Sequence, residues 1–149
     1  MSQSLSQMYI HLVFTTKNRF PFISNEIENS LHSYISGILK NLESTVISIN
    51  STSDHIHILF KLSKNLALAK VVEETKKHSS KWMKEQGVLK FSWQAGYGAF
   101  SVSSSKLKVV IKYIQNQKEH HRVKSFEEEI DEFMNEYNVK EYDPKYFLD

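Results

Sequence analysis

The chain of 149 residues contains no cysteine, which excludes a disulfide framework and a thiolate metal site. No run approaches the roughly 18 to 20 apolar residues that a membrane-spanning helix needs. The first seven residues are polar and lack the basic-then-apolar layout of a secretory signal. No internal repeat, low-complexity tract or linker divides the chain. These absences predict one cytoplasmic domain over residues 1–149, without a membrane partner.

Charge is distributed unevenly along the chain. Residues 126–149 hold nine acidic residues against two lysines, so the acidic tail over about 125–149 has a net charge of −7. Because the whole chain carries +2, residues 1–125 carry +9. Such a basic body fits a polyanionic partner, but it also fits lysines that merely solvate helix faces. Charge alone leaves both interpretations open.

Hydrophobic spacing predicts strand, helix, strand, strand, helix and strand, followed by two more helices. Met8, Ile10, Leu12 and Phe14 alternate with polar or mixed positions, which is typical of a strand. The first helix is expected from Ser24 or Asn25 to Leu42, with Asn25 and Glu28 as a capping pair. The other expected elements are strands over 45–49 and 55–62, a helix over 66–86, an extended segment over 88–102, and helices over 105–120 and from Ser125.

The first six elements predict an α+β fold of the ferredoxin-like, RRM-like kind. In this arrangement an antiparallel sheet carries helices on one face, and here the C-terminal helices are added to it. Such a sheet leaves its second face free for ligands. Fold alone does not establish a function.

Two histidines in the second expected strand of the 45–62 hairpin form a candidate metal site. His55 and His57 are two residues apart, so their side chains share one face of a strand and can reach one divalent cation. A shuffled chain with seven histidines has roughly a one-in-three chance of some such pair, so the pattern is weak by itself. The pair alone also fits a strand with two half-exposed histidines.

The third expected helix carries a second candidate. Tyr113 and Gln117 are four residues apart and stack on the flank of an apolar stripe formed by Leu107, Val110, Ile111 and Ile114. A side chain at that border is held by packing and still reaches a cleft. Taken alone, Tyr113 also fits an ordinary tyrosine at the edge of the core with its hydroxyl in water. Gln117 alone also fits a surface amide.

Taken together, these segments resemble a known family. The chain is similar to the single-tyrosine transposases of small bacterial insertion sequences, the insertion-sequence 200/605 kind, which belong to the histidine-hydrophobic-histidine nucleases. Each segment is weak alone, but their order and spacing cover almost the whole chain. The segments that carry the resemblance are 11–19, 53–60, 76–81, 91–102, 113–117 and 126–146.

The resemblance implies a mechanism for a single-strand DNA transposase. His55, His57 and Gln117 match the positions that hold one Mg²⁺ or Mn²⁺ in that family, and Tyr113 matches its nucleophile. A free phenol has a pKa of about 10, so its attack at neutral pH needs such a cation. The expected product is a 5′-phosphotyrosine at insertion-sequence ends, which a second 3′-OH religates without ATP. The resemblance also implies single-stranded DNA with hairpin ends, and a homodimer in which one subunit's tyrosine helix completes the other's site.

Several further residues carry weaker expectations. Lys17, Arg19, Lys76 and Lys81 are candidate phosphate contacts, although each also fits a solvated surface residue. His11 is expected to line the face of the histidine pair in a structural role. The acidic tail is a candidate either to cover the active site or to be exchanged between subunits, a hypothesis that rests only on its negative charge. If it inhibits, truncation after Lys124 raises cleavage.

Two alternatives to transposition remain at this stage. One is a related host enzyme that cuts chromosomal repeat hairpins and no longer moves an element. The other is a non-catalytic module that binds single-stranded nucleic acid on the open sheet face.

Overall fold

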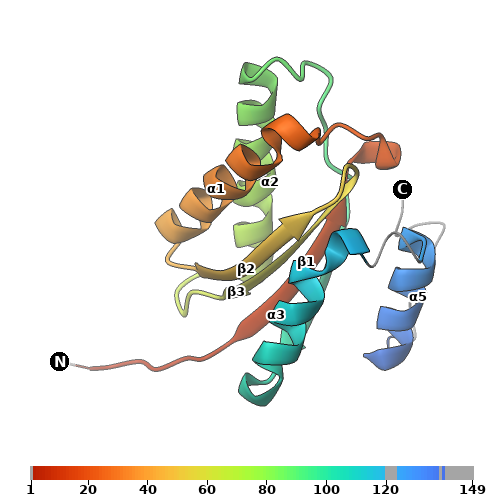
Figure 1. Cartoon of the computed structure of the whole chain (residues 1–149). Coiled ribbons are helices and arrows are strands. Elements are labelled where there is room, and N and C mark those ends of the chain that lie inside the picture. The colour runs from red at the N-terminus through yellow and green to blue at the C-terminus, as the bar shows by residue number, and fades with distance from the viewer. Residues whose placement is uncertain (1, 120–123, 138, 140–149) are drawn as a thin grey trace.

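The computed structural model describes residues 2–119, 124–137 and 139, and its elements follow the predicted order (Figure 1). A four-stranded sheet lies between helices on its two sides. No helix in these ranges is both long and apolar enough to cross a membrane. The elements are β1 (Tyr9–Thr15), α1 (Asn25–Asn41), β2 (Thr45–Ser51), β3 (His55–Lys61), α2 (Leu68–Glu85), β4 (Gly98–Val102), α3 (Leu107–Gln115) and α5 (Phe126–Glu136).

The sheet has the strand order β2-β3-β1-β4, and all neighbouring strands are antiparallel. This is the ferredoxin-like order, so the predicted fold class is confirmed. The central strands are β1 and β3, which pair with Val13 opposite His57. On the other side of β3, Asn50 of β2 lies opposite His57. His57 therefore lies in the middle of the sheet, flanked by a strand on each side.

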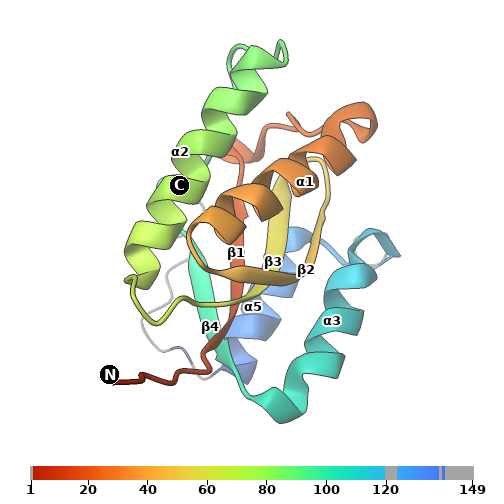
Figure 2. The same ribbon diagram turned by 90° about the vertical axis from the view of Figure 1, so that its left-hand side faces the viewer.

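One face of the sheet packs on α1 and α2 (Figure 2). Alternation along β1 puts Leu12 and Phe14 on this face, where neither retains any exposed surface. The apolar stripes of the two helices close over these side chains. The main buried partners are Leu31, Ile35, Leu39, Ile56, Ile58, Phe60, Val71 and Val72.

The opposite face of the sheet is covered by α3 and α5 (Figure 1). Val13 of β1 is buried in a cluster with side chains of α5, and Leu59 of β3 is buried against Ile114 of α3. The expectation of a free sheet face is therefore wrong. The C-terminal helices are apolar enough on one side to cover it, and they enclose whatever chemistry this face carries.

The helix ends agree only in part with the predicted caps. Ser24 is the N-cap of α1 but makes no side-chain cap, and the predicted Asn25–Glu28 pair is wrong because Glu28 is buried toward the sheet. The predicted start of a helix at Ser125 is confirmed, since Ser125 is the N-cap of α5 and its hydroxyl accepts from the Glu128 backbone N–H at 3.2 Å. Gly87 follows α2 with φ 100°, a conformation that glycine adopts without strain.

Two segments are shorter than predicted. Residues 88–97 form no regular strand beyond an isolated bridge, and β4 begins only at Gly98. A Cβ at Gly98 would lie 3.1 Å from Val13 Cγ1, so glycine permits the close approach of the two strands. The helix α3 ends at Gln115, and a new helical turn starts at Gln117. Gln117 therefore lies just past the helix that carries Tyr113.

Candidate metal and tyrosine site

The histidine pair lies at the start of β3, on the face that α3 and α5 cover. Both side chains are buried, and His55 Nδ1 lies 2.8 Å from Asp54 Oδ1 and 2.8 Å from Thr52 Oγ1. Burial alone would raise the pKa of Asp54, but the hydrogen bond and charge of His55, together with Arg19, hold it below its usual value. An ionised Asp54 accepts the Nδ1 proton, so the Nε2 lone pair of His55 points into the site.

His57 has another histidine as its partner. His11 of β1 places its Nε2 2.9 Å from His57 Nδ1. Burial, with the nearby His57, lowers the pKa of His11 to about 3, so His11 is neutral at pH 7. If the His57 Nδ1 proton is donated to Nε2 of the neutral His11, the His57 Nε2 lone pair would face a metal ion held at the site. Through this contact His11 is placed to orient the ring of His57, which is the form that its expected structural role takes.

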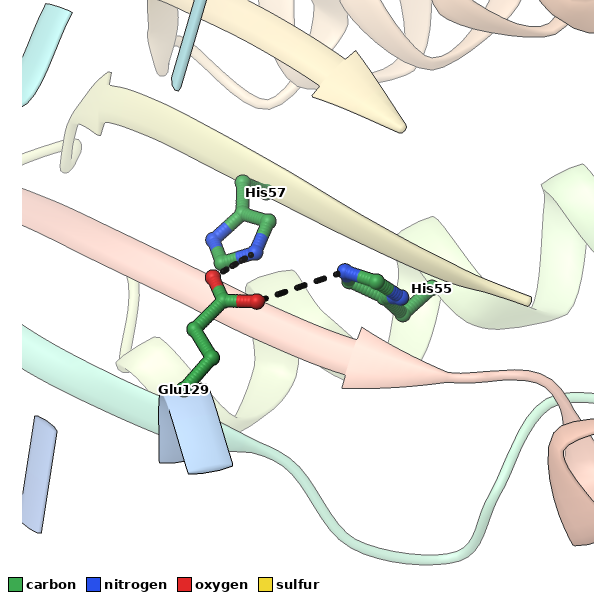
Figure 3. Close-up of side chains that lie close together, drawn as sticks. All are labelled: His55, His57 and Glu129. Carbon is green, nitrogen blue, oxygen red and sulfur yellow. Dashed lines mark ion pairs between the residues drawn. The ribbon is translucent and has the colours of Figure 1, made fainter. Parts of the chain in front are cut away.

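A third buried group, Glu129 of α5, faces both imidazoles (Figure 3). Its Oε1 lies 3.0 Å from His57 Nε2, and its Oε2 lies 3.8 Å from His55 Nε2. One potential ligand atom from each residue lies within 4.8 Å of the others, and no other such His, Asp or Glu trio occurs among the described residues. Two imidazole nitrogens and a carboxylate oxygen suit a divalent cation. The residues present therefore fit a metal ion.

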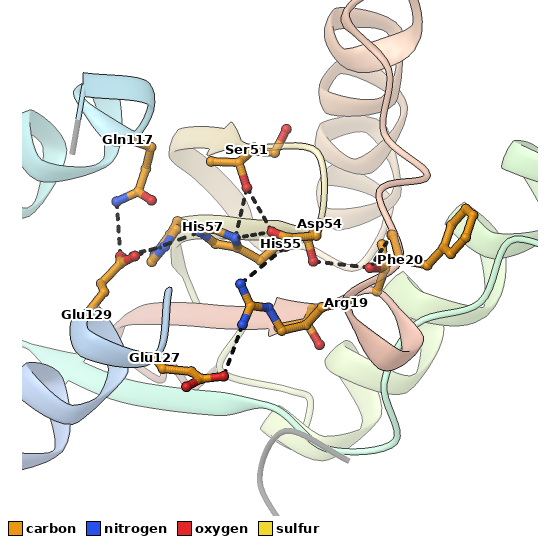
Figure 4. A network of polar contacts seen from close by, with 12 residues as sticks. Arg19, Phe20, Ser51, Asp54, His55, His57, Gln117, Glu127 and Glu129 are labelled. Carbon is orange, nitrogen blue, oxygen red and sulfur yellow. Dashed lines mark hydrogen bonds and ion pairs between the residues drawn. The ribbon is translucent and has the colours of Figure 1, made fainter. Parts of the chain in front are cut away.

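Tyr113 and Gln117 reach the same carboxylate. The Tyr113 hydroxyl donates a hydrogen bond to Glu129 Oε1. Figure 4 shows the second contact, in which Gln117 Nε2 donates to the same oxygen at 3.2 Å. Burial raises the pKa of Tyr113, and the negative charge of Glu129 acts in the same direction. The phenol is therefore protonated in this arrangement. The structure brings together within one chain all four residues predicted for the site: His55, His57, Tyr113 and Gln117.

The sequence prediction missed Glu129, although α5 carries a signal for it. Glu129 lies three residues after Phe126 and four before Phe133, so it occupies the apolar stripe of the helix. A carboxylate in such a stripe is costly to bury unless it finds a partner. That position distinguishes Glu129 from its neighbours Glu127 and Glu128, which are exposed.

The four candidate phosphate contacts differ in their surroundings. Lys17 and Lys81 are exposed. Arg19 forms ion pairs of 3.4 Å with Asp54 and with Glu127 (Figure 4). Lys76 is half-buried, donates to the carbonyls of residues 94 and 96 at 2.9 and 2.6 Å, and has its pKa lowered by burial to about 8. Their contact with DNA stays a prediction, and the exposed pair is the better placed for it.

His11→Phe is expected to weaken binding of Mn²⁺ by about 10- to 100-fold, the usual effect of losing a residue that orients a metal ligand. Phenylalanine fills the space but makes no hydrogen bond to His57 Nδ1, so the imidazole is no longer held with its Nε2 toward the metal site. Calorimetric titration with Mn²⁺ measures the change. His78→Gln is the matched control, because His78 is exposed on α2, where it pairs with Glu74 far from the histidine pair of β3. If both variants bind Mn²⁺ with equal affinity, His11 does not orient His57 for metal binding.

Known proteins share this fold. A candidate transposase from Deinococcus radiodurans R1, solved as a crystal structure, superposes with a TM-score of 0.64 at 20% identity, over 78% of this chain and 98% of that one. A REP-associated tyrosine transposase bound to a REP hairpin superposes with a TM-score of 0.59 at 15% identity, over 81% of this chain and 74% of that one. No curated protein matches the chain. The fold is thus one that transposases adopt.

The family follows from the sequence match. The family model described as "Transposase IS200 like" matches residues 4–117, which include β1 to α3 and all four predicted site residues. The chain belongs to this transposase family.

Proposed function

We propose that the protein is a single-strand DNA transposase that cuts and rejoins DNA through a covalent bond to Tyr113. The observation that supports this most directly is a single shared atom. Glu129 Oε1 accepts the Tyr113 hydroxyl proton in a hydrogen bond and lies 3.0 Å from His57 Nε2. A group on the reacting phosphate that takes the place of this oxygen would therefore touch the nucleophile and the metal-binding face together.

His55 and His57 would hold the divalent cation, Mg²⁺ or Mn²⁺, with Glu129 in the resting protein and with Gln117 within reach. When bound, such a cation neutralises charge on a non-bridging phosphate oxygen and makes the phosphorus a better electrophile. Asp54 and His11 keep the two Nε2 atoms turned inward. For Gln117 to act as a ligand, its amide Oε1 must face the cation, whereas the contact made in this structure is from its Nε2 to Glu129.

The chemical step exchanges one phosphoester for another. The Tyr113 oxygen forms a bond to phosphorus and loses its proton, while the bond to the leaving 3′ oxygen breaks and that oxygen gains a proton. The product is a 5′-phosphotyrosine and a free 3′-OH. Attack by a different 3′-OH reverses the step and joins a new strand. Because the phosphoester is never hydrolysed, the cycle needs no ATP.

The proposed substrate is single-stranded DNA that ends in imperfect hairpins. The basic body of the chain, with its net charge of +9 over residues 1–125, supports a nucleic-acid partner. Arrangement as a homodimer remains part of this proposal.

The deciding experiment incubates the purified protein with single-stranded DNA from the flanks of its own gene. A covalent protein–DNA band is expected with Mg²⁺ or Mn²⁺, and no band after EDTA, because the phenol is too weak a nucleophile unaided. Denaturing gels detect the adduct by its mass. An adduct that forms equally well in EDTA would contradict a metal-assisted step. If no adduct forms with either flanking or hairpin DNA, the proposal that the protein is a DNA-cleaving enzyme is contradicted.

The alternatives have unequal support. A non-catalytic binding module was expected to use an open sheet face, and α3 and α5 cover that face. A host enzyme that cuts repeat hairpins uses the same chemistry, so it is separated by genomic context. Hairpin ends that flank the gene favour transposition.

A further inference from the structure

Phe20 presents a large aromatic ring to solvent close to the histidine pair. Its side chain is 57% exposed, and Figure 4 shows the ring directed away from His55. The backbone that carries it is held in place, because the Phe20 carbonyl accepts from the Thr16 hydroxyl at 2.7 Å and from the Phe22 backbone N–H at 2.8 Å. The ring itself packs on Phe22, with centroids 4.5 Å apart. Its exposed surface is flat and apolar, which is what stacking on a planar ligand requires.

The turn over residues 16–20 has a strained backbone. Asn18 and Arg19 both have φ 56°, a left-handed conformation that residues other than glycine seldom adopt and that recurs at functional sites. Thr16 fastens the turn to the residue before His55, since its N–H donates to the Asp54 carbonyl at 2.9 Å and its hydroxyl lies 3.2 Å from the same oxygen. The turn therefore holds the side chains of Arg19 and Phe20 beside the metal-binding strand.

Arg19 is paired with one carboxylate near the site and with another at the surface. Its Nη2 lies 3.4 Å from Oδ2 of Asp54, whose Oδ1 lies 2.8 Å from His55 Nδ1. Its Nη1 lies 3.4 Å from Oε1 of Glu127, a side chain that is 66% exposed. Such exposed ion pairs contribute little free energy. A phosphate oxygen can therefore replace Glu127 while Asp54 keeps the guanidinium beside His55, and a guanidinium binds phosphate well.

The charge of this segment indicates the kind of partner. Residues 16–22 include Lys17 and Arg19 and no acidic residue, and Lys17 is exposed. Cations beside an exposed aromatic ring match single-stranded nucleic acid, in which phosphates and unpaired bases alternate. An acidic peptide would pair with the cations but need not offer a planar group to Phe20. A purely apolar partner would leave Lys17 without a counter-charge.

We infer that the 16–20 turn binds one nucleotide of a single-stranded DNA, with its base stacked on Phe20 and a phosphate on Arg19 in place of Glu127. The nucleotide is adjacent to the cleaved phosphodiester, because Asp54 connects Arg19 to His55. This inference rests on the proposed function, since it places one part of the same substrate. Phe20 and Arg19 bind the DNA and take no part in the chemical step.

Stacking is tested by the shape of the side chain at position 20. Phe20→Leu is expected to weaken binding of a fluorescein-labelled single strand from the gene's flanks by roughly 5- to 150-fold, the effect of losing one base–aromatic stack. Leucine still packs on Phe22 but offers no flat ring, whereas Phe20→Trp is expected to retain the affinity. Fluorescence anisotropy in EDTA measures binding without cleavage. Tyr34→Leu, which removes an exposed ring from α1, is the matched control. An unchanged affinity in Phe20→Leu, or an equal loss in Tyr34→Leu, would refute the stacking.

The exchange of Glu127 for phosphate is tested in the same assay. Glu127→Gln is expected to tighten binding by up to about fivefold, because the carboxylate no longer competes for Arg19. Glu128→Gln removes the same charge from the next position and is expected to have a smaller effect. Arg19→Gln is expected to lower the slope of log affinity against log salt concentration by about 0.7, as the loss of one phosphate contact on a single strand does. Equal effects of the two glutamate variants, or an unchanged slope in Arg19→Gln, would overturn the phosphate contact.

Photochemical cross-linking locates the base without any substitution in the protein. 5-Iododeoxyuridine is placed at one position at a time along the oligonucleotide, and mass spectrometry of the digested protein identifies the residue that is linked. A link to Phe20 is expected from a position adjacent to the cleaved bond. Links only to residues outside the turn would overturn the inference, even if the wild type forms its adduct. If Phe20 is linked but no DNA yields an adduct, the proposed function fails while the turn stands as a nucleic-acid-binding surface.

Discussion

Tyr113→Phe is expected to lower formation of the covalent protein–DNA adduct by at least about a thousandfold, because removing a covalent nucleophile removes the step and not merely a contact. The substitution deletes a single oxygen, the donor to Glu129 Oε1. The ring keeps its place between His11, His57 and Phe133, whose ring centroids lie 5.0 to 6.1 Å away. Packing and the affinity for single-stranded DNA are therefore expected to stay close to those of the wild type.

Gel analysis of the adduct and a DNA-binding titration measure these two effects separately. Tyr34→Phe is the matched control, since Tyr34 stacks on Trp82 at a centroid distance of 5.1 Å, among the helices on the other side of the sheet. It loses the same oxygen far from the proposed chemistry and is expected to form the adduct normally. An adduct that persists in Tyr113→Phe would assign the nucleophile to another residue. Loss of adduct and DNA binding together would leave Tyr113 as a binding residue only.

The part of this site that could be predicted depends on local periodicity. A strand places residues two apart on one face, so His55 and His57 had to lie side by side wherever β3 was placed. A helix places residues four apart on one flank, and although α3 ends at Gln115, the turn that begins at Gln117 still directs this side chain toward Tyr113 and its surroundings. Both spacings place the two side chains on the same side even when the predicted end of the strand or helix is wrong by a residue or two.

Long-range packing accounts for what could not be predicted. Sequence spacing shows that α5 has an apolar stripe, but it does not show which surface the stripe covers. In the structure Phe126 and Ile130 of α5 pack with Val13 of β1, more than one hundred positions earlier in the chain. That contact both closes the expected free face and brings Glu129 to the histidines. The sequence predicts His11 on the face of the histidine pair, but its contact with His57 depends on the pairing of β1 with β3.

The position of α5 changes how the predicted inhibition by the acidic tail should be tested. Truncation after Lys124 removes Glu129, but it also removes Phe126 and Ile130, whose side chains retain at most 1% of their exposed surface. An exposed apolar sheet face invites aggregation, so a lower rate in the truncated protein would not isolate the effect of charge. A substitution at Glu129 alone keeps the packing of the helix. The remainder of the tail, residue 138 and residues 140–149, lies outside the described residues.

Glu129→Gln is expected to have opposite effects on metal affinity and on reaction rate. Without DNA, the loss of an anionic ligand candidate weakens Mn²⁺ binding. With saturating Mn²⁺ and DNA, the rate of adduct formation is expected to rise by about tenfold, which corresponds to roughly 1.4 kcal/mol. This is less than the repulsion of ~4 kcal/mol between two like unit charges 4 Å apart at an effective dielectric constant of 20. In the proposed mechanism the carboxylate occupies the place of the reacting phosphate, and its charge acts with burial to raise the pKa of Tyr113. The neutral amide repels neither the phosphate nor the developing phenolate.

Single-turnover rates at increasing Mn²⁺ concentration separate the two effects, because metal affinity sets the midpoint and the chemical step sets the plateau. Glu128→Gln is the control, since it removes one charge from an exposed neighbour on the same turn of α5. If the plateau rate rises in both variants, the overall negative charge of the tail, and not the position of Glu129, accounts for the increase. A plateau that falls in Glu129→Gln would show that the carboxylate assists the reaction, as an ion ligand that stays in place or as the acceptor of the phenol proton. A plateau that rises only in Glu129→Gln identifies α5 as a helix whose buried carboxylate must leave before the phosphate can enter.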